Sequence, residues 1–249
     1  MIDLVRSEWI KLHTVRVNYV LGIIGAAFPL IVVVLVAALS GEPELRFGND
    51  LVRIVIDTMV ISAILFGVIG ALNLTSEYSH GTIRTTFAAV PQRATLLLVK
   101  AGVSLAATTI FATIVMIVTY GIGAIILSGR NAQLSIDGNG RTALIGIVIL
   151  CGMLSLFGYG LGLIIRNSAA TVAVFILWPL LLENIVRGVL SASGVHNPTP
   201  WLPYQSAFAM ASSELGPGDP SRLHGGLYLG AVVVVIIAIG IVVNERRDA

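Results

Sequence analysis

Long apolar runs separated by short polar stretches make up most of the chain. Six of these runs are nearly free of charge: residues 17–39, 51–74, 101–127, 142–165, 168–190 and 225–243. A helix of about 20 apolar residues, rising about 1.5 Å per residue, spans the hydrocarbon core of a bilayer. The pattern therefore predicts an all-α membrane protein with six transmembrane helices in a single domain, residues 1–249.

Two of the polar stretches carry a pattern of their own. Residues 1–16 mix apolar and charged side chains, which predicts an amphipathic helix lying in the membrane interface before the first span. Residues 191–224, before the last span, contain five prolines and form the longest connection.

The composition agrees with a membrane protein and not with a soluble one. Hydrophobic residues make up 56% of the chain and charged residues 11%, whereas soluble domains carry about 25% charged residues. The net charge of +2 is too small, and the basic residues too scattered, to indicate a nucleic-acid partner. We expect the lipid bilayer to surround the chain.

The distribution of lysine and arginine predicts the orientation. Six spans place both termini on one side, together with the connection 73–100 and the turn at residue 166. That side holds nine basic residues: Arg6, Lys11, Arg16, Arg84, Arg93, Lys100, Arg166, Arg246 and Arg247. The other side holds six: Arg46, Arg53, Arg130, Arg141, Arg187 and Arg222. Since basic residues favour the cytoplasmic side, both termini are predicted to be cytoplasmic.

The cytoplasmic connection 73–100 contains a short amphipathic pattern. Gly81 interrupts the preceding helix, and Pro91 ends the next one. Between them, three apolar side chains follow helical spacing at i, i+4 and i+7: Ile83, Phe87 and Val90. An exposed apolar face at this position predicts docking against lipid or protein, and we favour a protein.

Four charged residues lie inside two predicted spans, near their outer ends. Arg53 and Asp57 are four residues apart in the second span, as are Glu183 and Arg187 in the fifth, so each pair shares a helix face. Charges at this depth turn to a partner or a wet cavity, which predicts that the four form a common outer gate. The alternative is two separate pairs whose arginines reach the headgroups.

The sequence indicates no catalytic, metal or cofactor site. The four histidines lie in connections or at their edges, and none has a helical partner at metal-ligand spacing. Neither lysine has the glycine-rich setting of a phosphate-binding loop, so ATP is not expected to bind this chain. Gly158 and Gly162 lie inside the fourth span, where their spacing predicts close packing of helices.

The connection after the second span also carries a family resemblance. It contains Glu77-Tyr78-x-x-Gly81-Thr82-Ile83-Arg84-Thr85-Thr86, followed by Pro91-x-Arg93 and Lys100. This stretch resembles the ABC type-2 exporter permeases, and in particular their short six-span bacterial subunits. The entry stretch Ser7-Glu8-Trp9-x-Lys11-Leu12 and the outer Trp201-Leu202-Pro203 are compatible with that family.

The resemblance implies a fold and a function. In the family the segment between spans two and three is a cytoplasmic coupling helix seated on a separate ATPase, and Glu77, Gly81, Arg84 and Phe87 fall in it. The resemblance also implies that part of residues 191–224 could fold back into the membrane. The chain would be a permease subunit of the bacterial plasma membrane and no enzyme itself. It would pair with a second permease copy or paralogue and two ATPase subunits, which bind ATP and Mg. The substrate would be a drug, a peptide or a lipid-like molecule.

Two other functions remain open at this point. An ion-coupled secondary transporter would use Asp57 or Glu183 as its proton-binding carboxylate and would need no ATPase. An intramembrane hydrolase would need His196 beside Glu183. An ATPase encoded next to the permease would favour an ABC exporter permease over the secondary transporter and the hydrolase.

Overall fold

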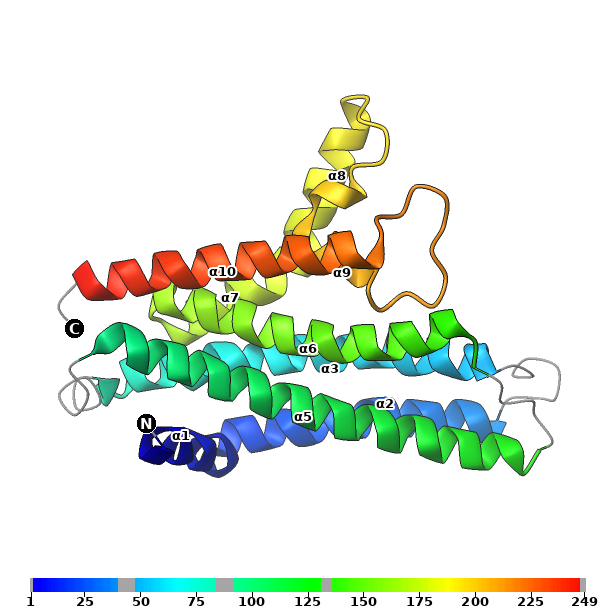
Figure 1. Ribbon diagram of the computed structural model, residues 1–249, viewed down its shortest axis with the longest axis horizontal. Helices are drawn as coiled ribbons and strands as arrows, with labels where there is room; N and C mark the ends of the chain where they lie inside the picture. Colours follow the sequence, from blue (N-terminus) through cyan, green and yellow to red (C-terminus); the bar gives the residue numbers. More distant parts are fainter. Residues whose placement is uncertain (1, 40–47, 84–91, 131–135, 247–249) are drawn as a thin grey trace.

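The computed structural model describes residues 2–39, 48–83, 92–130 and 136–246. Within these ranges the chain is helical apart from turns and short connections, and it contains no strand. Five long helices lie side by side (Figure 1): α2 (Arg16–Leu39), α3 (Gly48–Ser79), α5 (Arg93–Ser128), α6 (Gly138–Ile165) and α10 (Arg222–Arg246). The interfacial helix α1 (Ile2–Thr14) and the last turn of α10 lie at the same end of this bundle, which we call the terminal end.

Six helices are long and apolar enough to cross a membrane. They are Arg16–Leu39, Asn49–Ser79, Arg93–Ser128, Gly138–Ile165, Ser168–Ala192 and Arg222–Arg246. The prediction of an all-α protein with six spans is confirmed. Two helices extend further than their apolar runs, because α3 continues to Ser79 and α5 begins at Arg93. Both extensions carry polar side chains that find partners inside the protein, as described below.

Helix α6 forms the centre of the bundle and packs most extensively against α3. Its glycines allow the two backbones to approach closely. A Cβ atom on Gly158 would lie 2.1 Å from the carbonyl oxygen of Gly67, and one on Gly70 would lie 2.0 Å from that of Ser155. The predicted close packing at Gly158 is confirmed. Cys151 is fully buried in the same core.

The fifth span changes direction partway along. Helix α7 (Ser168–Leu177) runs with the bundle, the π-helical turn η1 (Trp178–Leu182) follows, and α8 (Glu183–Ala192) projects away from the other helices (Figure 1). Pro179 lies in η1, and a proline has no N–H for the regular helical hydrogen bond. The span predicted for residues 168–190 is thus two helices joined by a π-helical turn.

The segment after α8 returns to the bundle. The short helices η2 (Thr199–Trp201) and α9 (Pro203–Phe208) lie against the first turns of α10. The hydroxyl of Tyr228 donates to the carbonyl of Trp201 at 3.0 Å, and a Cβ atom on Gly225 would lie 2.0 Å from the carbonyl oxygen of Ser206. Residues 209–221 then form a loop at the end of the bundle opposite the terminal end (Figure 1).

Candidate functional site

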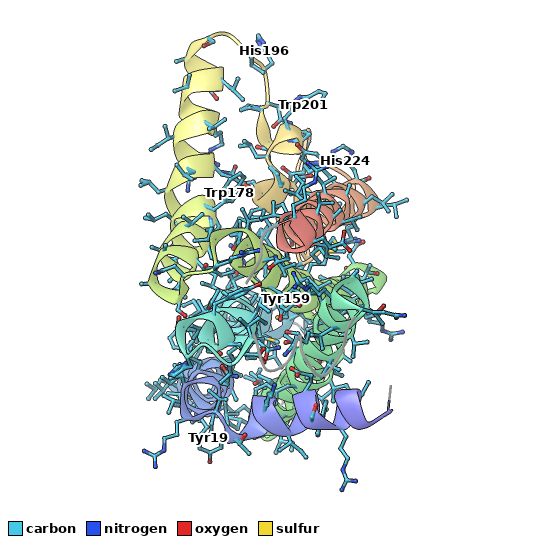
Figure 2. All side chains as sticks on the ribbon, turned by 90° about the vertical axis from the view of Figure 1, so that its left-hand side faces the viewer. Tyr19, Tyr159, Trp178, His196, Trp201 and His224 are labelled. Atoms are coloured by element: carbon cyan, nitrogen blue, oxygen red, sulfur yellow. The ribbon has the colours of Figure 1, made fainter. Side chains whose placement is uncertain are left out.

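A ring of four charged side chains lies at the terminal end, where α1 crosses the bundle (Figure 2). The Lys100 ammonium lies 2.7 Å from Oε1 of Glu8 and 2.6 Å from Oε1 of Glu77. The Lys11 ammonium lies 3.0 Å and 2.9 Å from the same two oxygens. We call these four residues the charge ring, because every acidic member contacts both basic ones.

Three helices supply the ring. Glu8 and Lys11 are three residues apart on α1, so they share a helix face. Glu77 lies in the last turn of α3, and Lys100 lies in the second turn of α5. The ring therefore joins the interfacial helix to the two spans that flank the predicted coupling segment.

The ring is deeply buried on one side. The side chains of Glu8 and Lys100 are each 1% exposed, that of Glu77 is 8% exposed and that of Lys11 is 43% exposed. Among the described residues, Oε2 of Glu8 and Oε2 of Glu77 are buried and accept no hydrogen bond. The free energy needed to remove two charges from water is about as large as the free energy gained from their attraction. Such a ring therefore contributes little net stability, and its main effect is to fix how α1, α3 and α5 are placed relative to one another.

Lys11 lies outside the membrane spans and remains protonated at neutral pH. Burial by itself lowers the pKa of its amine, but the hydrogen bonds and charges of Glu77 and Glu8 outweigh that effect and raise the pKa above 10.5. Lys11 therefore keeps its positive charge in the ring under physiological conditions.

A second polar cluster holds the neighbouring residue of α3. Tyr78 donates its hydroxyl to Oδ1 of Asn244 on α10. The Arg166 guanidinium donates to the same oxygen at 2.8 Å and lies 5.3 Å from the centre of the Tyr78 ring. Asn244 in turn donates to the carbonyl oxygens of Leu163 and Gly240 at 2.9 Å and 2.7 Å. We call Tyr78, Arg166 and Asn244 the Tyr78 cluster.

The two clusters attach the last turn of α3 on both sides. Glu77 connects it to α1 and α5, while Tyr78 connects it to α10 and to the turn between α6 and α7. Arg166 adopts a left-handed backbone conformation in that turn, with φ of 58°. The last turn of α3 is therefore joined to α1, α5 and α10, and to the turn between α6 and α7.

The chain that follows α3 begins with an anchored turn. Gly81 has φ of +70°, a left-handed conformation that favours glycine after a helix. The Thr82 hydroxyl donates to the carbonyl of Glu77 at 3.4 Å. Ile83 is 3% exposed and belongs to a small apolar cluster with Leu74, Leu96, Leu97, Ala101, Tyr159 and Leu163. Ile83 thus faces the protein interior.

The remaining predicted coupling residues, Arg84, Phe87 and Val90, lie outside the described residues. The amphipathic helix predicted from them stays a prediction. Of the six residues assigned to coupling, the structure places Glu77, Gly81 and Ile83, and it brings all three to the end of α3.

The residues predicted to form an outer gate do not make equivalent pairs. Arg53 and Asp57 form an ion pair at 3.9 Å with side chains 73% and 61% exposed. Arg187 instead donates to Oδ1 of Asn184 at 3.0 Å. The expected pair between Glu183 and Arg187 is not formed, because Glu183 is turned into the protein.

Glu183 caps the short helix α9. Its Oε1 accepts from the backbone N–H of Tyr204 at 2.8 Å and from the Trp178 indole at 2.9 Å, and its Oε2 accepts from the backbone N–H of Gln205 at 2.9 Å. A carboxylate at a helix N-terminus satisfies N–H groups that lack helical partners. Glu183, 3% exposed, thereby fastens the returning segment to the base of α8.

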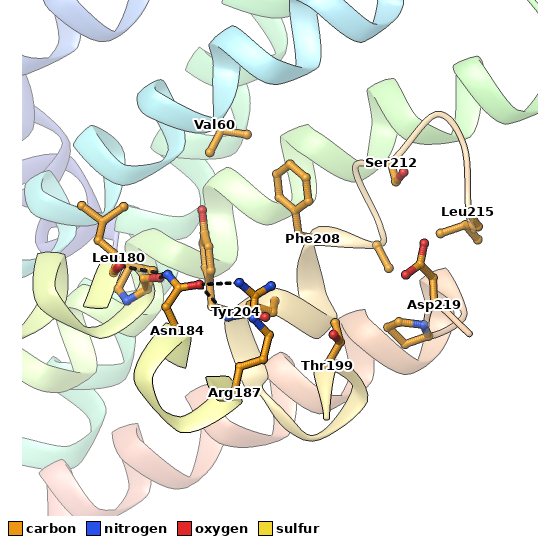
Figure 3. Close-up of a pocket in the computed structure, with 14 residues that line it drawn as sticks. Val60, Leu180, Asn184, Arg187, Thr199, Tyr204, Phe208, Ser212, Leu215 and Asp219 are labelled. Carbon is orange, nitrogen blue, oxygen red and sulfur yellow. Dashed lines mark hydrogen bonds between the residues drawn. The ribbon is translucent and has the colours of Figure 1, made fainter. Parts of the chain in front are cut away.

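Two cavities lie beside these residues. A cavity of about 440 Å³ separates Val60 of α3 from Arg187 and Asn184 of α8, with Phe208 of α9 on its wall (Figure 3). A second cavity of about 260 Å³ is lined by Arg53 and Asp57, and it shares Phe208 and Ser212 with the first. Three of the four predicted gate residues therefore line adjoining cavities, and Glu183 lines neither.

The groups that a hydrolase would need are not assembled in the part of the chain described. His196 lies at the tip of the arm formed by α8 (Figure 2), and its Nδ1 lies 3.2 Å from the carbonyl oxygen of Gly194. Both oxygens of Glu183 are occupied by N–H donors. No group of three or more histidine, cysteine, aspartate or glutamate side chains in the described ranges is arranged to hold a metal ion.

Sequence reasoning missed the ring partners and the Tyr78 cluster. One signal was available for Lys100, which lies at the start of an apolar run and has no acidic residue three or four positions away on its own helix. A lysine without a local partner points to a partner on another helix. For Asn244 and Arg166 the sequence offers no comparable signal, because both lie at helix ends where polar residues are common.

Comparison with known families agrees with this architecture. No curated protein matches the chain. The model of the family described as "ABC-2 family transporter protein" matches residues 4–180, which include most of α1, the ring, the end of α3 and the first four spans. Because the match covers more than half of the 249 residues, the chain belongs to the ABC-2 family of transporter proteins.

Proposed function

We propose that the chain is the membrane subunit of a bacterial ABC exporter, which moves a drug, a peptide or a lipid-like molecule with energy from a separate ATPase. Membership of the ABC-2 family makes it a multi-pass transport subunit and supports pairing with an ABC ATPase. The observation that carries the proposal is the double attachment of the last turn of α3. A push on the segment after α3 reaches α1 and α5 through Glu77, and α10 through Tyr78.

The proposal includes an assembly and an orientation. Two ATPase subunits bind at the terminal end, which faces the cytoplasm, and a second permease copy or paralogue completes the path through the membrane. ATP and Mg bind to the ATPase chains. The excess of lysine and arginine on the terminal side supports this orientation.

The proposed contact with the ATPase is the segment that begins at Gly81 and includes Arg84, Phe87 and Val90. Its support is the family match, which covers this segment, together with the anchored turn at Gly81 and Thr82 from which it starts. The variant Phe87→Asp introduces an unpaired charge into the contact and is expected to weaken assembly. Its matched control is Val195→Asp, which introduces the same charge at a 38% exposed apolar position in the turn after α8, outside the spans and away from the terminal end.

Co-expression with the ATPase encoded beside the permease tests the proposal. The purified permease alone is expected to hydrolyse no ATP, and transport into vesicles is expected to require the ATPase. Transport by the lone permease under a proton gradient would instead identify an ion-coupled transporter. Full retention of the ATPase by Phe87→Asp would show that this face does not bind it.

The outer gate is a second part of the proposal. Its support is that Arg53, Asp57 and Arg187 line adjoining cavities between α3 and α8. A double-mutant cycle on Asp57→Asn and Arg187→Gln, read as transport, is expected to give an interaction energy of at least about 0.5 kcal/mol, because their two cavities adjoin at Phe208 and Ser212 and form one pathway in this proposal. Strictly additive effects would argue for two independent sites.

A further inference from the structure

We propose that α1 is a movable part of the coupling site, which docks on α3 and α5 through the charge ring and leaves it as an electrically neutral unit. The inference rests on the proposed function, because it assigns α1 a role in transmitting the motion of the ATPase. Glu8, Lys11 and Lys100 then act as positioning residues for the end of α3.

The charge balance of the ring carries the inference. Helix α1 contributes one carboxylate and one ammonium, Glu8 and Lys11, which lie 3.0 Å apart. The bundle contributes the other two, Glu77 and Lys100, which lie 2.6 Å apart. If α1 moves away, each half keeps a complete ion pair, and no single charge is left buried. Leaving one charge unpaired is the step that makes breaking a buried ion pair costly.

The described apolar side chains of α1 bury little surface. Among the α1 side chains that the structure describes, at positions 5–11 and 14, only Glu8 is buried. Val5, Trp9 and Ile10 are 45%, 40% and 50% exposed. Apolar burial, the usual source of helix docking energy, is therefore small on these positions. Glu8 of the ring is thus the described α1 side chain that enters the protein most deeply.

The connection to α2 allows such a motion. Helix α1 ends at Thr14 and α2 begins at Arg16, so Val15 alone separates them. Helix α1 crosses the end of the bundle while α2 runs along it (Figures 1 and 2). The N–H of Val15 donates to the carbonyl of Lys11 at 3.1 Å, and its own carbonyl accepts from the N–H of Tyr19 at 3.1 Å. In this proposal α1 swings by opening the Val15–Lys11 hydrogen bond while α2 stays in place, as in other hinges that use a few residues at helix ends.

Charge reversal of one half of the ring separates docking from folding. The double variant Glu8→Lys with Lys11→Glu keeps α1 neutral but places lysine beside Lys100 and glutamate beside Glu77. The double variant Glu77→Lys with Lys100→Glu does the same from the other side. Combining all four substitutions restores an alternating ring. The neutral variant Glu8→Gln with Lys11→Met removes the attraction without adding repulsion and leaves the pair between Glu77 and Lys100 intact.

Two measurements read the variants. Spin labels on cysteines at Ile10 of α1 and Leu98 of α5, both about half exposed, report the distance between α1 and α5 in the permease alone. ATP hydrolysis by the complex with its ATPase reports coupling, and co-purification reports assembly. We expect each half reversal to displace α1 and to lower permease-dependent hydrolysis about tenfold, within the usual range of coupling between sites. The ATPase should still co-purify, and the fourfold reversal should restore both signals.

The possible outcomes separate the two proposals. If the wild-type permease neither binds the ATPase nor changes its hydrolysis, the proposed function fails and the role of α1 fails with it. If the wild type couples and a half reversal displaces α1 with unchanged hydrolysis, only the role of α1 is overturned. An unchanged distance between the labels in both the half reversals and the neutral variant would show that the ring does not dock α1. A fourfold reversal that folds but does not recover would also overturn the proposal.

Discussion

The Lys100 ammonium is held almost entirely out of water by two carboxylates. Replacing it with methionine keeps the side-chain length but leaves Glu8 and Glu77 with one shared cation. Removing one partner of a buried ion pair costs about 3–5 kcal/mol. We expect Lys100→Met to lower the free energy of unfolding by this order, measured by thermal or denaturant unfolding in detergent.

Lys11 provides the matched control on the opposite corner of the ring. It contacts the same two oxygens, but its side chain is 43% exposed. Water already screens this charge, so Lys11→Met is expected to cost about 1 kcal/mol or less. Equal losses for the two variants would show that burial does not distinguish the two lysines.

At the scale of residues, the sequence predicts some of the site and not the rest. The break at Gly81 was predictable, since a glycine after a helix is a local signal. Ile83, by contrast, faces the protein interior and not the exposed docking face that its helical spacing with Phe87 and Val90 predicts. The partners of Glu77 were not predictable, because Glu8 and Lys100 lie 69 and 23 positions away from it. Which of several charges meet depends on how the helices pack.

At the scale of elements, the position of α9 depends on a single acidic side chain. Glu183→Gln keeps the shape of the side chain but replaces one acceptor oxygen with an NH₂ group that faces a backbone N–H. Loss of such a cap costs about 0.5–2 kcal/mol. We expect a stability loss of this size together with faster hydrogen exchange at the amides of Tyr204 and Gln205.

Arg187→Gln serves as the control for this element. Arg187 lies one turn further along α8 and donates to Asn184, whereas the backbone N–H groups of Tyr204 and Gln205 donate to Glu183. It is expected to leave the exchange of those two amides unchanged. Equal protection in wild type and Glu183→Gln would indicate that α9 is held by its packing on α10.

The contact between α3 and α6 depends on glycine. A Cβ atom on Gly158 would clash with the carbonyl of Gly67, whereas one on Gly102 of α5 would meet nothing within 4 Å. Overpacking of this kind typically costs about 1–3 kcal/mol. Alanine in an open helical position gains about 0.5–1 kcal/mol over glycine. We expect Gly158→Ala to destabilise the protein and Gly102→Ala to stabilise it, and an equal response would contradict this packing.

The sequence predicts the existence of helices better than their directions. Apolar runs locate all six spans to within a few residues at most ends, because bilayer thickness fixes their length. They do not reveal that α8 leaves the bundle, because residues 168–190 read as one apolar run long enough to span the membrane. Two local signals mark the change: Pro179, and the charged residues Glu183 and Arg187, which make α8 less apolar than the helices that stay within the bundle. A proline alone is tolerated in many membrane helices.

At the scale of the whole molecule, the proposed orientation can be measured with cysteine labels. The native Cys151 is buried, so it should not react with a membrane-impermeant maleimide. We expect a cysteine at Ser193, at the tip of α8, to be labelled in intact cells. A cysteine at His80, exposed at the terminal end, should be labelled only after permeabilisation. The reverse pattern would place the termini outside.

The charge ring also has a consequence for the order in which the protein is made. Of the four ring residues, Glu8 and Lys11 leave the ribosome first. They can form an ion pair with each other before Glu77 and Lys100 are synthesised. Glu77 follows, and Lys100 comes 23 residues later, a delay of about 1–5 s at usual synthesis rates. Nascent chains arrested before Lys100 is released should leave α1 open to protease, and chains arrested beyond it should protect it. Lys100 is thus the last of the four residues to be synthesised. Once it is in place, the ring can form and α1 can dock on α3 and α5.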